Sequence, residues 1–330
     1  MSDRAKVFVT RIIPEAGLSL IRQHCDAEVW QEQLPPPYDV LKEKVAHCDG
    51  LVSLLTDRID PELLDAAPRL KVVSNYAVGF NNINIPEATK RGIAVGNTPG
   101  VLTDATADMA FCLLISAARR VVEGHVYSCS GQWKTWEPLG HLGQDLVGAT
   151  LGIVGMGRIG FAMAKRCKAW DMNILYYDIN DCPPAEQELG AKKVDFDTIL
   201  SECDFISIHT LLDDTTRGMF NEAAFKKMKK TAVLVNSARG PIIDQKALTE
   251  ALKSGEIFAA GLDVTDPEPP SPDDPLLKLP NVVVAPHIAS ATVGTRNAMA
   301  EICAKNLIAG VSGEKLPAFV NPEVEANRRK

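Results

Sequence analysis

The sequence predicts an α/β protein built from two doubly wound domains, each with a parallel sheet at its centre. The first observation is length, because 330 residues exceed what one ordinary hydrophobic core holds. The second is a regular succession of apolar runs separated by helix-like segments. The third is that these runs are continuously apolar rather than alternating, which is typical of strands covered on both faces by crossover helices. Together they favour two layered α/β domains.

Eleven apolar runs are predicted to be strands, five in the first domain and six in the second. In the first domain the strands are expected at residues 7–10, 27–30, 50–54, 71–75 and 93–96. In the second they are expected at 150–155, 173–178, 204–210, 232–238, 259–264 and 282–286.

The boundary between the domains is predicted at Asn97-Thr98-Pro99-Gly100, where Pro-Gly interrupts the chain. Thr103-Asp104 can then cap a long helix whose apolar side chains lie on one face. A second long helix is expected over residues 293–309, and the tail after it is too short to form a domain. We therefore expect residues 1–99 in one domain, 100–289 in the other, and 290–330 packed back onto the first.

Composition narrows the class of protein. A formal net charge of −7 disfavours nucleic acid or an anionic membrane surface as the main partner. The N-terminal segment lacks the features of a signal peptide, and the longest apolar helix falls short of the roughly 20 residues of a membrane span. The eight cysteines form no Cys-x-x-Cys pair and no Cys/His cluster with ligand spacing. We expect a cytoplasmic protein with reduced thiols and no metal.

A glycine motif predicts a dinucleotide site. Gly155-Met156-Gly157-Arg158-Ile159-Gly160 follows a predicted strand and precedes a helix-like run over residues 161–170. In this context Gly155 permits the tight turn, Gly157 lets the backbone approach a pyrophosphate, and Gly160 permits close packing of helix on strand. The helix start, with Arg158 and Ile159, offers free N–H groups and the positive end of the helix dipole. The second domain is therefore predicted to be a Rossmann domain.

Asp178 points to the type of dinucleotide. It ends the next strand, 18 residues after Gly160. A carboxylate there can accept hydrogen bonds from both ribose hydroxyls and would repel a 2′-phosphate. The following Ile179-Asn180-Asp181 brings no cation to offset that repulsion. NAD(H) is therefore favoured over NADP(H).

Three reactive side chains follow later strands of the second domain. Arg239, Glu268 and His287 come after the strands predicted at 232–238, 259–264 and 282–286. Ligands of an open parallel sheet bind outside the carboxyl ends of its strands, so these side chains should meet the nucleotide site.

The three residue types suit the reduction of a keto acid. Arg239 is a bidentate cation for the substrate carboxylate and the carbonyl dipole. His287 can donate a proton to the developing alkoxide, because histidine titrates near neutral pH. Glu268 would hold the imidazole in place and favour its protonated form.

These motifs resemble the D-isomer-specific 2-hydroxyacid dehydrogenase family over nearly the whole chain. The most specific stretches are the glycine motif, Asn236-Ser237-Ala238-Arg239-Gly240, Gly261-Leu262-Asp263-Val264 with Pro267-Glu268-Pro269, and Pro286-His287-Ile288-Ala289-Ser290. Within the family the sequence is most similar to the glyoxylate/hydroxypyruvate reductases, as Lys6-Val7-Phe8-Val9-Thr10-Arg11 and the segment from Asp263 to Pro269 indicate.

The resemblance implies a flavodoxin-like substrate domain formed by residues 1–99 and the C-terminal tail, around a central dinucleotide-binding domain at 100–289. It implies that the backbone N–H groups of Val78 and Gly79 bind the substrate carboxylate, together with Arg239 and His287. Cofactor contacts are implied, beyond the glycine motif and Asp178, for Thr106, His209, Thr210, Ala238, Asp263 and Ser290. It also implies a homodimer joined through the nucleotide-binding domain, with residues 127–143 as the candidate arm.

The predicted function is therefore NAD(H)-dependent reduction of glyoxylate and hydroxypyruvate to their 2-hydroxy acids, with His287 as proton donor. Two alternatives remain. One is the same chemistry on a larger acid, such as 2-ketogluconate or phosphohydroxypyruvate. The other is an NADH-sensing binding protein similar to the corepressors that resemble this family, which keep the same three residues.

Overall fold

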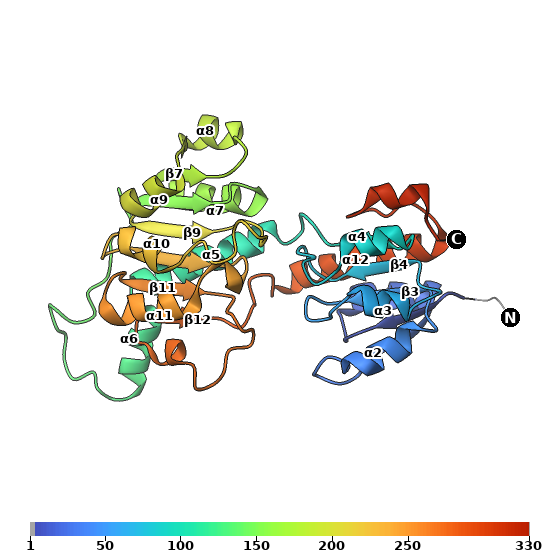
Figure 1. The fold of residues 1–330 in the computed structure, drawn as a ribbon. Helices are drawn as coiled ribbons and strands as arrows, with labels where there is room; N and C mark the ends of the chain where they lie inside the picture. The colour runs from blue at the N-terminus through green and yellow to red at the C-terminus, as the bar shows by residue number, and fades with distance from the viewer. Residues whose placement is uncertain (1–3, 330) are drawn as a thin grey trace. The chain divides into compact units, whose positions relative to one another are not determined.

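The computed structural model describes residues 4–329, which form two compact units (Figure 1). The first unit comprises Met1–Leu102 and Ala291–Lys330, and the second comprises Thr103–Ser290. The chain thus changes unit at residues 102–103 and 290–291, against the predicted domain limits of 99–100 and 289–290. The first three residues and residue 330 of the predicted domains lie outside the described part of the chain.

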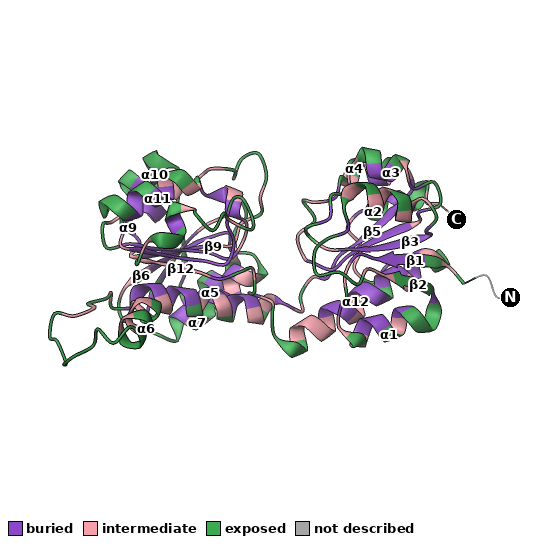
Figure 2. Cartoon of the chain, turned by 90° about the horizontal axis from the view of Figure 1, so that it is seen from below, coloured by how far each residue is buried: buried purple, intermediate pink, exposed green. Residues whose placement is uncertain are grey.

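The first unit is a five-stranded parallel sheet in the order β2-β1-β3-β4-β5, the flavodoxin-like order. Its strands are β1 (Lys6–Val9), β2 (Asp26–Val29), β3 (Gly50–Ser53), β4 (Val72–Asn75) and β5 (Ala94–Gly96). One face carries α2 (Tyr38–Val45), α3 (Pro61–Asp65) and α4 (Ile85–Lys90), and the other carries α1 (Glu15–His24) and α12 (Val293–Ser312) (Figure 2). A short helix η3 (Pro322–Ala326) ends the unit.

The C-terminal helix α12 is an integral layer of the first unit. Gly17 of α1 lies so close to α12 that a Cβ there would stand 2.3 Å from the carbonyl oxygen of Ala300. The buried Ser74 of β4 donates to the carbonyl of Cys303 at 2.8 Å. These contacts explain why residues far apart in sequence share one core.

The second unit is a seven-stranded parallel sheet in the order β12-β11-β10-β9-β6-β7-β8. Counted from β6, this is the Rossmann order 3-2-1-4-5-6 with one further strand. The strands are β6 (Thr150–Val154), β7 (Asn173–Tyr177), β8 (Lys192–Lys193), β9 (Phe205–Ile208), β10 (Val233–Asn236), β11 (Ala259–Leu262) and β12 (Val282–Val284). The predicted fold class, two doubly wound parallel-sheet domains, is confirmed.

Helices cover both faces of this sheet (Figure 2). One face carries α5 (Thr103–Ala118), α6 (Val121–Cys129) and α7 (Arg158–Lys168), and the other carries α9 (Phe196–Glu202), α10 (Glu222–Lys227) and α11 (Gln245–Ser254). The remaining elements are α8 (Pro183–Leu189) and the short helices η1 (Gly240–Ile242) and η2 (Pro275–Lys278). None of the described helices is long and apolar enough to cross a membrane.

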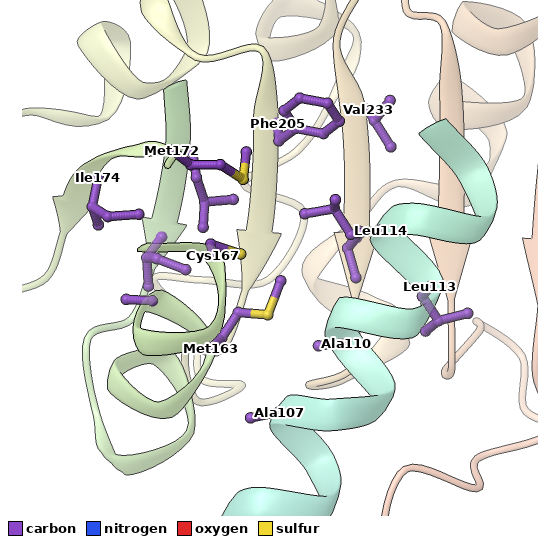
Figure 3. Close-up of a cluster of buried hydrophobic side chains, with 14 of the residues drawn as sticks. Ala107, Ala110, Leu113, Leu114, Met163, Cys167, Met172, Ile174, Phe205 and Val233 are labelled. Carbon is purple, nitrogen blue, oxygen red and sulfur yellow. The ribbon is translucent and has the colours of Figure 1, made fainter. Parts of the chain in front are cut away.

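The core under α5 fixes where the glycine motif lies. Ala107, Ala110 and Leu114 of α5 face Met163 and other side chains of α7 and the strands (Figure 3). Small residues on α5 let the two helices lie close together over the sheet. The start of α7, where the glycine motif lies, is held at the carboxyl end of β6 as a result.

All eleven predicted strands have a counterpart, and β8 is an addition. This strand consists of two exposed lysines paired with β7, so it has no apolar run by which the sequence could indicate it.

Candidate active site

The carboxyl ends of six strands of the second unit bring the predicted residues to one sheet edge. Because the paired strands are all parallel, these ends lie along the same side of the sheet. Six positions follow strand ends directly or within three residues: Gly155 after β6, Asp178 after β7, His209 after β9, Arg239 after β10, Asp263 after β11 and His287 after β12. This clustering is the arrangement expected when each of these residues follows a strand of one parallel sheet.

Glu268 and His287 form a direct pair. Glu268 Oε1 lies 2.5 Å from His287 Nδ1, and both side chains keep part of their surface open to solvent. The backbone of His287 is left-handed, with φ of 53°, which is uncommon for a residue with a Cβ. Its N–H donates to the carbonyl oxygen of Asp263 at 2.9 Å. The position of His287 is therefore fixed by a contact of its ring with Glu268 and by a hydrogen bond of its backbone to Asp263.

Asp263 holds the loop that carries His287. Its two carboxylate oxygens accept the backbone N–H groups of Ile288 and Ala289, each at 2.8 Å. The side chain is almost fully buried at the end of β11, and burial raises the pKa of Asp263 although the two N–H groups counteract part of that effect. The structure thus gives Asp263 a positioning task, whereas the family resemblance implies only a cofactor contact.

Arg239 follows β10 in a turn that is closely packed. A Cβ on the next residue, Gly240, would stand 1.9 Å from the carbonyl oxygen of Thr265, so only glycine fits there. Asn236 fixes the turn by accepting the N–H of Ala238 and donating to the carbonyl of Arg239, both at 2.9 Å. Burial lowers the pKa of Arg239, and the negative charge of Glu268 partly offsets this. A guanidinium remains charged under such conditions.

The three glycines of the motif differ in what surrounds them. A Cβ on Gly155, whose φ is +96°, would stand 2.5 Å from Thr210 N, and one on Gly160 would stand 2.1 Å from the carbonyl oxygen of Gly155. A Cβ on Gly157 would meet nothing within 4 Å. Gly155 and Gly160 are thus required by the fold itself, whereas Gly157 leaves open space beside the start of α7.

That open space suits a pyrophosphate. Gly157 is the N-cap of α7 and has no side chain with which to satisfy the first N–H groups of Arg158 and Ile159. Free N–H groups at a helix N-terminus form an anion site. The residues present therefore fit the dinucleotide that the motif implies. Among the described residues, no group of three His, Cys, Asp or Glu side chains could hold a metal ion.

Asp178 is fixed by the backbone around it. Its Oδ2 accepts the N–H of Met156 in the glycine motif, and its Oδ1 accepts the N–H of Asn180, both at 2.8 Å. The loop after β7 also receives a cation that its own sequence lacks. Lys193 of β8 places Nζ 2.7 Å from Asp181 Oδ1 and 3.5 Å from the carbonyl oxygen of Ile179.

His209 lies at the end of β9 beside the glycine motif. Its Nε2 is 2.8 Å from the hydroxyl oxygen of Ser207, and its backbone N–H donates to Val154 O at 2.7 Å. Burial lowers the pKa of His209 to about 3, so the ring is neutral near pH 7. The structure places the other predicted contacts in the same unit, with Thr106 buried on α5 and Thr210, Ala238 and Ser290 partly buried after strands.

Val78 and Gly79 belong to the first unit, just beyond the carboxyl end of β4. Asn97 Nδ2 donates to the carbonyl of Val78 at 2.8 Å, and Asn75 Nδ2 donates to the carbonyl of Gly79 at 2.9 Å. Both carbonyl groups are therefore held by amide side chains. No local sequence pattern indicates this task for the two asparagines, because it depends on contacts formed only in the folded chain.

Comparison with known proteins points to one family. The family model for the D-isomer specific 2-hydroxyacid dehydrogenase NAD binding domain matches residues 111–289. A glyoxylate reductase of Korarchaeum cryptofilum is 55% identical over 97% of each chain. The crystal structure of the TT0316 protein from Thermus thermophilus is 44% identical with a TM-score of 0.90, covering 96% of this chain and 99% of that one. An NADPH-dependent glyoxylate/hydroxypyruvate reductase of Sinorhizobium meliloti is 30% identical with a TM-score of 0.85, covering 99% of both.

Proposed function

The chain belongs to the D-isomer specific 2-hydroxyacid dehydrogenase family of oxidoreductases, and within that family we propose that it reduces glyoxylate and hydroxypyruvate with NADH. The observation that carries this proposal is the Glu268–His287 pair, which follows strands at the same sheet edge as Arg239 and the glycine motif. The high identity to a glyoxylate reductase supports the choice of a small 2-keto acid.

The proton donor follows from the geometry of the pair. Because Glu268 occupies Nδ1 of His287, Nε2 is the nitrogen left to face a substrate. We assign to His287 the transfer of its Nε2 proton to the keto oxygen, which becomes the hydroxyl of the product. The hydride that the keto carbon receives is supplied by NADH when it is bound. The atoms then balance as a 2-hydroxy acid and NAD⁺.

Arg239 is assigned to the substrate carboxylate and the carbonyl dipole. Its guanidinium is partly buried, and removal from water strengthens its interaction with an anion. The backbone N–H groups of Val78 and Gly79 are proposed as further donors to the carboxylate, in a segment whose carbonyl groups are already held by Asn97 and Asn75. Glu268 acts through His287 and is a positioning residue in this scheme.

NADH is proposed as the preferred cofactor because of Asp178. Its carboxylate is fixed against the glycine motif through Met156 N, so it cannot move away freely from a 2′-phosphate. The cofactor contacts proposed with it are the first turn of α7 and the residues that follow β9, β10 and β12, namely Arg158, Ile159, Gly160, His209, Thr210, Ala238 and Ser290, together with Thr106 on α5.

Turnover by purified protein tests the proposal. Loss of NADH or NADPH absorbance is followed with glyoxylate, hydroxypyruvate, pyruvate and 2-ketogluconate in parallel. The proposal expects rapid turnover of the first two acids with NADH. Activity confined to 2-ketogluconate would replace the substrate and keep the chemistry. Binding of NADH without turnover of any acid would contradict the enzyme and favour a sensing protein.

We also propose that the protein is a homodimer joined through the second unit. Helix α6 has no buried residue, and the segment after it exposes Trp133, Trp136, Leu139 and Leu142. Apolar side chains gathered in this way mark an interaction surface. Light scattering of the wild type and of a Trp136→Asp variant tests the interface, since the wild type should have twice the mass of the variant. A monomeric wild type would contradict it.

A further inference from the structure

The loop that follows β7 carries a lysine–aspartate pair whose lysine comes from another strand. Lys193 pairs with β7 through the register of Tyr176 and Lys193, two residues before Asp178. Its Nζ lies 2.7 Å from Asp181 Oδ1 and 3.5 Å from the carbonyl oxygen of Ile179. The ammonium group therefore sits against the residue directly after Asp178.

The two partners are held to different degrees. The side chain of Lys193 is 32% exposed, whereas that of Asp181 is 76% exposed. Lys193 is therefore the more buried partner of this ion pair, and Asp181 is the more exposed one. The neighbouring Lys192 is also exposed, but adjacent side chains of a strand point to opposite faces of the sheet. Only Lys193 of these two has an ion-pair partner recorded among the described residues.

The charged groups at this end of the site leave an excess of one negative charge. Asp178 and Asp181 are carboxylates, and Lys193 supplies an ammonium group that pairs with Asp181. A 2′-phosphate on the adenosine ribose carries close to two negative charges at neutral pH. A free lysine would attract that phosphate by a charge-assisted hydrogen bond, but a lysine already paired with a carboxylate offers much less.

We propose that the Asp181–Lys193 pair is a second determinant of the choice between NADH and NADPH. Asp181 occupies the ammonium group of Lys193 and so withholds it from a 2′-phosphate, while Asp178 repels that phosphate directly. This inference rests on the proposed use of the glycine motif and Asp178 for a nicotinamide dinucleotide. The cation that could bind the 2′-phosphate of NADPH is then Lys193 of β8, which lies outside the loop that contains Asp178.

The test measures dissociation constants of NADH and NADPH by fluorescence titration of the wild type, Asp181→Asn, Lys193→Met and the double variant. Asp181→Asn should lower the ratio of the NADPH constant to the NADH constant about fivefold or more, since it releases one charge-assisted donor. The double variant should lose this gain. Asp181→Asn combined with Lys192→Met is the matched control, because it removes an equal charge from the same strand and should keep the gain.

The outcomes separate this inference from the proposed function. An unchanged ratio in Asp181→Asn, with normal NADH binding by the wild type, overturns the role of the pair and leaves the proposed function standing. A gain that persists without Lys193 also overturns it, because the effect would then come from net charge alone. Wild-type protein that binds neither dinucleotide would overturn both proposals. Thermal unfolding of each variant checks that these surface substitutions leave the fold intact.

Discussion

Glu268 Oε1 lies 2.5 Å from Nδ1 of His287, although the two residues are 19 positions apart and belong to different loops. Glu268 lies in the proline-rich segment after β11, and His287 follows β12, so the pair is assembled by the pairing of these two strands. The contact occupies Nδ1, so Nε2 is the ring nitrogen assigned to the substrate in the proposed reaction. Two peptide bonds of the segment that carries Glu268 are cis, Asp266-Pro267 and Glu268-Pro269.

Replacing Glu268 by glutamine should lower kcat for glyoxylate reduction by roughly 10²-fold, the order expected when an imidazole loses its orienting carboxylate. The dissociation constant of NADH, measured by fluorescence, should stay within about twofold, because that contact is not assigned to Glu268. Asp273→Asn is the matched control: this acid lies in the same segment, is 97% exposed and pairs only weakly with Lys278 at 3.7 Å. A kcat that falls equally in both variants would contradict the pairing.

Replacing Asp263 by asparagine should impair both stability and turnover. An amide has one oxygen, so one of the two N–H groups of Ile288 and Ala289 would face an NH₂ group. We expect a loss of about 1–3 kcal/mol in the free energy of unfolding, measured in urea, and a lower kcat because the His287 loop shifts. Asp274→Asn is the control, since Asp274 also accepts two hydrogen bonds but outside this edge. Equal kcat values in the two variants would argue against the positioning role.

Substitutions in the glycine motif can separate an effect on NADH binding from an effect on the stability of the fold. Gly157→Ala meets no atom within 4 Å and keeps an allowed φ of −72°, so its free energy of unfolding should change by less than about 0.5 kcal/mol. Its NADH affinity should nevertheless fall by at least about tenfold, because the methyl group occupies the space offered to the pyrophosphate. Gly160→Ala should instead cost about 1–3 kcal/mol of stability through its clash with Gly155. Unchanged NADH binding by Gly157→Ala would show that the dinucleotide lies elsewhere.

His209 should make stability depend on pH. Burial holds the pKa of His209 at about 3 in the folded protein, against 6.5 for an ordinary histidine. Below pH 6.5 the unfolded chain therefore binds a proton that the folded chain does not, and stability is lost as the pH falls toward 3. From pH 7 to pH 5 the loss should be at most about 2 kcal/mol, since the ring keeps some contact with solvent.

Unfolding in urea at pH 7 and pH 5 checks this. His209→Gln should show a smaller loss of stability between the two pH values than the wild type, by up to about 2 kcal/mol. The exposed His47→Gln variant is the control for removing a histidine. A wild type and a His209→Gln variant with the same pH dependence would contradict a buried, neutral His209.

The sequence predicted the parts of this fold that depend on apolar periodicity and glycine spacing. Runs such as 150–155 and 232–238 cover β6 and β10, because strands buried on both faces must be apolar throughout. Strand β8 lacked this signal, since Lys192 and Lys193 form a short polar edge. The sequence of the loop after β7 therefore indicates no cation, because Lys193 reaches that loop only through the pairing of β7 with β8.

The side chains of the candidate site also differ in how far a local sequence pattern indicates them. The positions of Arg239, Glu268 and His287 after successive strands could be predicted from the apolar runs, whereas their roles in proton or anion chemistry stay predictions. Asp263 was expected to contact the cofactor, but its hydrogen bonds to Ile288 and Ala289 are long-range contacts that no local pattern encodes. Asn75 and Asn97 hold the Val78–Gly79 segment through contacts of the same kind.

His287 is proposed to supply the proton for reduction of a small 2-keto acid. The most direct test compares NADH oxidation by glyoxylate in the wild type and in His287→Gln, with the NADH dissociation constant measured on the same preparations. We expect a fall in kcat of about 10²- to 10⁴-fold, the usual contribution of a general acid, with the NADH dissociation constant within about twofold of the wild-type value. A His287→Gln variant that turns glyoxylate over at the wild-type rate would show that His287 is not the proton donor.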